Sequence, residues 1–261
     1  MQQSQHATRL AARPVPRLDS LRATVARIER HVHKADPAKL PLPFGLDALD
    51  GSLPGGGLPL SALHEVVGAG PDLTHAAGAA RFAAGILARL PGPVLWVMER
   101  ADLFAPGLAS AGLHPDRVIL ARAGRDTLLV AEEGLRHRGL AGVVTELSGP
   151  LSLTASRRLH LAAQASGVTA LVLRRPWRAD GMTQGATAAA TRWRVAALPS
   201  DPGLPHAAGM PGLRPVRWRL DLLRCRGGRT GSWIVEACGA TGHLGMVPPL
   251  ADRPAALART G

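Results

Sequence analysis

Residues 53–75 read LPGGGLPLSALHEVVGAGPDLTH, and this stretch decides the fold. It predicts a glycine turn, a buried strand from Ala62 to Val67, a second glycine loop from Gly68 and a helix that begins near Asp72. A strand, a glycine loop and a helix N-terminus form the phosphate site of many α/β proteins, because loop N–H groups and the helix dipole converge on an anion. The scaffold of a nucleotide-binding protein is therefore expected here.

The residues that carry phosphate chemistry are absent from this loop. The functional pattern is G-x-x-x-x-G-K-[ST], in which the lysine reaches the outer phosphates and the hydroxyl holds magnesium. Aligned from Gly68, the pattern meets Leu73, Thr74 and His75 where it needs glycine, lysine and a hydroxyl. Gly68 and Gly70 are then expected only to make a tight strand-to-helix turn. We predict no cofactor, no metal ion and no catalytic residue.

The composition indicates a folded protein with a large positive charge. Apolar residues make up 46% of the 261, and 31 basic against 19 acidic residues give a formal charge of +12. This balance favours a polyanionic partner, and nucleic acid ranks before membrane because no amphipathic membrane helix is evident. No run of about 18 uncharged apolar residues occurs either. The N-terminus lacks the apolar segment of a signal peptide, so a cytoplasmic protein is expected. Its two cysteines, Cys225 and Cys238, are expected to be reduced.

Apolar runs alternate with helical segments through the middle of the chain. Strands are predicted at 94–98, 118–121, 142–145 and 170–173, and helices at about 72–90, 104–112, 126–138 and 152–166. This alternation is typical of βαβ units and of a parallel sheet that is buried on both faces. Further strands are predicted at 193–198, 216–224 and 231–237, and the last two form an antiparallel hairpin.

Three regions follow from these patterns. Residues 1–40 are expected to be flexible apart from one amphipathic helix, residues 41–238 to form the α/β domain, and residues 239–261 to form a flexible tail. The apolar stripe of the N-terminal helix consists of Leu18, Leu21, Val25 and Ile28. This stripe either packs on the core of the chain or docks on a partner protein, with Leu21, Val25 and Ile28 as candidate contacts.

The C-terminal half places arginines next to tryptophans. Eleven arginines and three aspartates lie between Arg174 and Arg229. An arginine beside an aromatic ring can hold a phosphate while the ring stacks on a base, which favours single-stranded nucleic acid. The candidate DNA-binding residues are Arg174, Arg175, Trp177, Arg178, Arg217 and Arg219. The alternative, preferred for Trp193 and Trp218, is that tryptophans belong to the core and arginines to a solvated face.

The order of elements, headed by FGLDALDGSLPGGGLPLSALHEVVG at residues 44–68, resembles the RecA-like core. Within that superfamily the degenerate loop, the length and the basic C-terminal half are most similar to the ImuA family, over residues 42–246. The resemblance implies an α/β fold with a mainly parallel sheet, flanking helices and an antiparallel C-terminal hairpin. It also implies an accessory protein of damage-induced (SOS) translesion DNA synthesis that associates with the nucleoid when DNA is damaged.

The same resemblance implies the partners. These are an ImuB-like Y-family polymerase homologue and an error-prone replicative-type DNA polymerase, with RecA and single-stranded DNA as further candidates. No membrane partner is implied.

Two other functions compete with this one. A RecA-like ATPase needs one carboxylate that activates water and another that holds magnesium. Glu99 and Glu146 end predicted strands near these two positions, although an alignment from Gly112 puts Arg100 at the first of them. A SulA-like inhibitor of cell division rests on family similarity alone. The missing phosphate clamp favours a non-catalytic protein over both.

Overall fold

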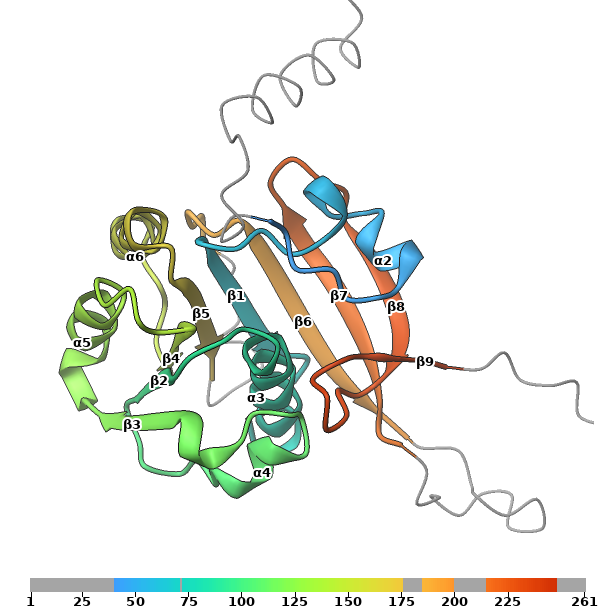
Figure 1. Cartoon of the computed structure of the whole chain (residues 1–261), viewed down its shortest axis with the longest axis horizontal. Helices are drawn as coiled ribbons and strands as arrows, with labels where there is room; N and C mark the ends of the chain where they lie inside the picture. Colours follow the sequence, from blue (N-terminus) through green and yellow to red (C-terminus); the bar gives the residue numbers. More distant parts are fainter. Residues whose placement is uncertain (1–39, 71, 176–184, 200–214, 248–261) are drawn as a thin grey trace, which may run out of the picture. The chain divides into compact units, whose positions relative to one another are not determined.

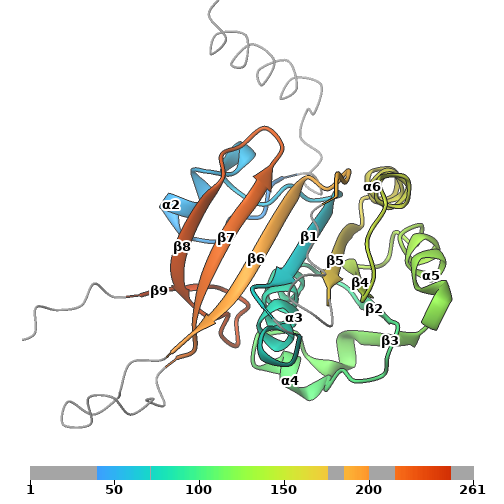
Figure 2. The same cartoon turned by 180° about the vertical axis from the view of Figure 1, so that it is seen from behind.

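The computed structural model describes residues 40–70, 72–175, 185–199 and 215–247. In these ranges one mixed sheet of nine strands carries helices on both faces (Figures 1 and 2). The predicted contacts Leu21, Val25 and Ile28 lie outside the described residues. No helix in the described ranges is long and apolar enough to cross a membrane.

The elements follow the predicted alternation. The strands are β1 Leu63–Gly68, β2 Val94–Met98, β3 Val118–Arg122, β4 Gly142–Leu147, β5 Thr169–Arg174, β6 Thr191–Leu198, β7 Arg217–Cys225, β8 Gly231–Glu236 and β9 Gly245–Met246. The α-helices are α2 Asp47–Asp50, α3 Asp72–Ala88, α4 Pro106–Ala109, α5 Thr127–Gly134 and α6 Leu153–Ser166.

The strand order is β3-β2-β4-β5-β1-β6-β7-β8-β9. Neighbouring strands from β3 to β6 run parallel, whereas β7, β8 and β9 each run antiparallel to the strand before them. The parallel sheet and the C-terminal hairpin of the predicted RecA-like fold are thereby confirmed. Every residue of β1 and β4 is buried, because helices cover both faces of the sheet at its centre.

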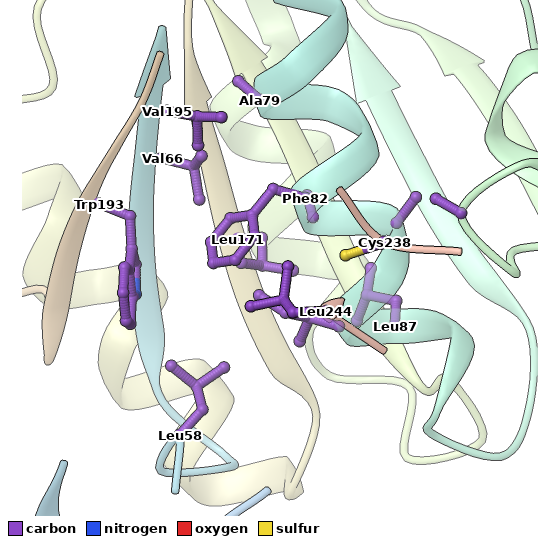
Figure 3. Close-up of a cluster of buried hydrophobic side chains, with 14 of the residues drawn as sticks. Leu58, Val66, Ala79, Phe82, Leu87, Leu171, Trp193, Val195, Cys238 and Leu244 are labelled. Atoms are coloured by element: carbon purple, nitrogen blue, oxygen red, sulfur yellow. The ribbon is translucent and has the colours of Figure 1, made fainter. Parts of the chain in front are cut away.

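The larger core lies between α3 and the sheet. Figure 3 shows Phe82 and Leu87 of α3 against Leu171 of β5, with Trp193 of β6 nearby. Trp193 and Phe82 are both fully buried, with ring centroids 5.4 Å apart. A second cluster, which includes Ala131 of α5 and Leu159 of α6, packs on the opposite face of the sheet.

The predicted start of the flexible tail at residue 239 is wrong. Cys238 and Leu244 are 2% and 7% exposed and lie against α3 (Figure 3), and β9 pairs with β8. The packing depends on small residues: a Cβ on Gly242 would come within 2.7 Å of the Gly85 carbonyl oxygen. Because glycines make this contact, the segment shows no apolar period. The folded domain therefore extends at least to residue 247.

Two helices are shorter than predicted. The helix expected at 104–112 is one turn, Pro106–Ala109, and α5 ends at Gly134 instead of residue 138. Gly107 within the first and Gly112 after it, at φ +87°, weaken a longer helix.

A buried histidine links the centre of the sheet to its neighbours. The Nε2–H of His64 donates to the Pro59 carbonyl, and its Nδ1 accepts from the Thr191 hydroxyl, both at 2.8 Å. The same hydroxyl accepts from Trp193 Nε1 at 2.8 Å. Burial is the main reason that the pKa of His64 is lowered to about 4. The native state therefore holds this imidazole neutral.

This histidine should make the fold sensitive to acid. The unfolded chain binds a proton at His64 below about pH 6.5, whereas the folded chain does not until about pH 4, so unfolding becomes easier by about 3 kcal/mol across that window. Urea unfolding at about pH 7.5 and 4.5 should show a smaller loss for His64→Gln than for wild type. The exposed His114→Gln is the matched control. An equal loss in all three proteins would contradict the role of His64.

Candidate functional site

A side chain of α3, His75, packs against the loop between β1 and α3. A Cβ on Gly68 would lie 2.6 Å from Cβ of His75, and a Cβ on Gly70 would lie 2.9 Å from two atoms of the imidazole. Neither glycine has a left-handed φ, so backbone conformation does not explain why glycine stands at these two positions. Glycine is needed there because His75 packs where a Cβ would lie. The Ala69 amide donates to the Val195 carbonyl of β6 at 2.9 Å. The predicted tight turn therefore exists, and a histidine ring fills its inner side.

The other residues of the degenerate loop lie in α3. Thr74 is exposed on the helix, at the position where the pattern needs lysine. Leu73 also falls within α3, and its side chain is outside the described residues. The Nδ1 atom of His75 is buried and has no hydrogen-bond partner within the part of the chain that the structure describes.

Arg175, directly after β5, binds three carboxylates. Its guanidinium donates to both oxygens of Asp72 at 3.1 and 2.9 Å, and to both oxygens of Asp102 at 2.7 and 2.9 Å. It also donates to Glu146 at 2.5 Å. These three residues come from the N-terminus of α3, the loop after β2 and the strand β4. We call Arg175 with these three residues the arginine-carboxylate cluster.

The electrostatics of this cluster favour the charged forms. Burial opposes the charge of Arg175, but its hydrogen bonds to the carboxylates outweigh burial and raise the pKa of the guanidinium. The hydrogen bond from Arg175 likewise holds the pKa of Asp102 below its usual value. Arg100 adds ion pairs to Asp72 at 3.4 Å and to Asp102 at 3.7 Å.

The two candidate ATPase carboxylates have structural partners. Glu146 accepts from Arg175 and, at 2.7 Å, from Trp96 Nε1, whereas Glu99 accepts from the Ser148 amide at 3.0 Å. ATP with magnesium therefore does not fit the residues present, because His75 packs into the loop and Arg175 already occupies Glu146. Within the described ranges, no group of three acidic, His or Cys side chains is arranged to hold a metal ion.

A pocket of about 590 Å³ opens beside the cluster. Its wall is built from alanines of α3, including Ala76, Ala77 and Ala80, and from the loop that carries Phe104. Arg175 and its carboxylates form its polar end. Apart from this polar end, the pocket is lined largely by apolar side chains.

The predicted DNA-binding residues lie in four different surroundings. Arg175 belongs to the cluster, and its side chain is only 16% exposed. Burial lowers the pKa of Arg174, which Glu65 opposes and Arg192 reinforces. Trp177 and Arg178 lie outside the described residues. Arg217 and Arg219 lie on β7, where the side chain of Arg219 is 47% exposed.

Two tryptophans of the basic half lie in the core instead of on its surface. Trp193 and Trp218 are 0% and 1% exposed and belong to the core beneath α3. The preferred prediction for both is confirmed. Many arginines have a structural task as well: Arg117 donates to four carbonyls at and beyond the end of α3, and Arg226 to the Ala188 carbonyl.

Sequence reasoning missed Asp72 and Asp102 as members of the cluster, Trp96 as a hydrogen-bond donor to Glu146, and Arg194 as a neighbour of Arg219. Arg194 of β6 donates to Asp221 of β7 at 2.8 Å, and Arg219 lies 3.6 Å from the same carboxylate. The signal for Asp72 and Asp102 was their place after β1 and β2, at the carboxyl edge of a parallel sheet, where polar side chains converge.

Comparison with known proteins points to one family. Protein ImuA from two strains of Caulobacter vibrioides, NA1000 / CB15N and ATCC 19089 / CIP 103742 / CB 15, is 45% identical over 235 residues, which cover 84% of this chain and 94% of each relative. The crystal structure of the RadB recombinase matches with a TM-score of 0.52 at 19% identity, over 79% of this chain and 99% of RadB. No family model matches the chain.

Proposed function

The chain belongs to the ImuA family, and on this premise we propose that it is a non-catalytic, RecA-like accessory protein of damage-induced, error-prone translesion DNA synthesis. It binds an ImuB-like Y-family polymerase homologue and works with an error-prone replicative-type DNA polymerase. Its contribution is binding, and it hydrolyses no nucleotide. The identity to Protein ImuA and the RecA-like fold support the accessory role.

The arginine-carboxylate cluster carries this proposal. A divalent cation at Asp72, Asp102 or Glu146 would have to displace a guanidinium that makes five hydrogen bonds to them. The loop offers no compensation, since the missing lysine removes a phosphate contact of about 1.5–3 kcal/mol. Both halves of a nucleotide site are thus replaced by contacts within the chain.

DNA contact is proposed for the face of β6 and β7 that points away from α3. Arg194 and Arg219 flank Asp221 there, with side chains 33% and 47% exposed, and Arg217 lies two residues before Arg219. Because Trp193 and Trp218 face the core, this surface would hold phosphates without stacking bases. Single-stranded DNA is therefore a weaker and more salt-dependent partner than the sequence predicts.

Partner binding is the experiment that tests the proposed function. Calorimetric titration of the full chain with the purified Y-family polymerase homologue should show a complex with a Kd of about 1 µM or below, unchanged by ATP and magnesium. A polymerase homologue that does not bind, or binds only with ATP, would refute a non-catalytic accessory role.

A further inference from the structure

A groove separates α5 from α6, which lie side by side on the face of the sheet opposite α3 (Figures 1 and 2). Two adjoining hollows of about 490 and 230 Å³ form it and share Glu132 and Arg158 as lining residues. We call this feature the α5–α6 groove. Neither the arginine-carboxylate cluster nor the basic face of β6 and β7 contributes a residue to it.

The groove exposes leucines that the core does not use. Leu129 on α5 is 62% exposed, and Leu161 on α6 is 54% exposed. The same helices bury other residues, such as Ala131 and Leu159, against the sheet. Each helix therefore carries an exposed leucine on the groove side in addition to the residues that it buries, and nothing in the described part of the chain covers these leucines. Exposed apolar residues that line a groove favour a protein partner.

The charges around the groove select the partner. Four arginines line it against two carboxylates, and Glu132 is held by Arg158 at 2.5 Å and Arg136 at 3.4 Å. Arg125 at one end and Arg138 at the other have no hydrogen bond or ion pair with any residue in the part of the chain that the structure describes. Two unpaired arginines at the ends of an apolar groove complement carboxylates at the ends of an apolar segment.

We propose that the α5–α6 groove binds an amphipathic helix of the polymerase partner that carries leucine-like side chains on one face and carboxylates at both ends. Helix α5, Thr127–Gly134, is roughly 12 Å long, which accommodates about two turns of a partner helix with contacts at i, i+3, i+4 and i+7. A second copy of the chain fits less well, because its net charge of +12 brings positive charge to a positive groove. This inference rests on the proposed function.

Paired variants in the same calorimetric titration test the groove. Leu129→Glu with Leu161→Glu is expected to weaken binding of the polymerase homologue at least about tenfold. Arg125→Glu with Arg138→Glu is expected to weaken it by about tenfold at low salt and less at high salt. Ile234→Glu, at a residue 57% exposed on β8, is the matched control and should bind as wild type. All substituted side chains are exposed, so the fold should persist.

The outcomes separate the two proposals. If the wild type does not bind the homologue, the proposed function fails before the groove is tested. If the wild type binds and the leucine pair binds equally well, the groove is not the interface. If only the leucine pair loses binding and the charge-reversed pair does not, the partner segment is not acidic. Self-association of the wild type that the leucine pair abolishes in sedimentation would assign the groove to a second copy and overturn the proposal.

Discussion

Replacing Arg175 with alanine is expected to lower the free energy of unfolding by about 3–5 kcal/mol, because it leaves three carboxylates close together without their cation. The guanidinium binds Asp72, Asp102 and Glu146 with a side chain only 16% exposed, so water replaces little of the lost interaction. Arg175→Lys should recover only part of the loss, since one ammonium cannot reproduce the paired contacts to two aspartates. Urea denaturation at neutral pH gives the measurement.

Acid should reduce this difference. Arg175 lowers the pKa of Asp102, so its contribution through this residue is present at neutral pH and is lost as the Asp102 carboxylate becomes protonated. The gap between wild type and Arg175→Ala should therefore shrink below about pH 4. Arg122→Ala, at an exposed arginine that ends β3, is the control and should change stability by at most about 0.5 kcal/mol. Equal stability of Arg175→Ala and wild type would show that the cluster has no structural role.

Replacing Trp193 with alanine is expected to cost about 3–5 kcal/mol of unfolding free energy, as large-to-small changes in a core do. Its ring lies 5.6 Å from Phe44 and 5.4 Å from Phe82, and its Nε1 donates to Thr191. Without the indole, the Thr191 hydroxyl, which also hydrogen-bonds to His64, would lose its donor Trp193 Nε1. Thermal or urea unfolding should show it directly.

The milder Trp193→Phe separates the core role from base stacking. It should fold, and it should bind single-stranded DNA as wild type does, because the ring does not reach the surface. Arg219→Ala should instead reduce the slope of log K against log salt by about one phosphate contact. A stable Trp193→Phe protein with weakened DNA binding would contradict the core assignment.

The strands could be predicted from the sequence because strands that are buried on both faces consist of consecutive apolar residues. Val94–Met98 was predicted without error, and the runs at 142–145 and 170–173 differ from β4 and β5 by at most two residues at an end. A strand buried on both faces needs a continuous apolar run, and few other elements produce one of that length. The antiparallel hairpin could be predicted for a related reason, since alternate residues of β7 face the core.

The site could be predicted only in part, because its contacts join distant segments. Arg175 stands beside Trp177 and Arg178 in the sequence, which indicates a nucleic-acid loop, yet its carboxylates are 29, 73 and 103 residues away. The packing of His75 on Gly68 could not be predicted either. The sequence shows that the lysine is missing, but it does not show that the histidine packs into the turn. Glycine contacts such as Gly85 with Gly242 leave no apolar period to detect.

The central claim is that the chain retains a RecA-like scaffold whose nucleotide site is filled by its own side chains. Titration of the full chain with labelled ATP and magnesium tests this most directly. We expect no binding up to about 1 mM, and no hydrolysis even when Leu73→Gly, Thr74→Lys and His75→Thr restore the loop pattern, because Arg175 still holds the carboxylates. Binding with a Kd of about 1 µM that Gly68→Val abolishes, or turnover by the triple variant, would contradict the claim.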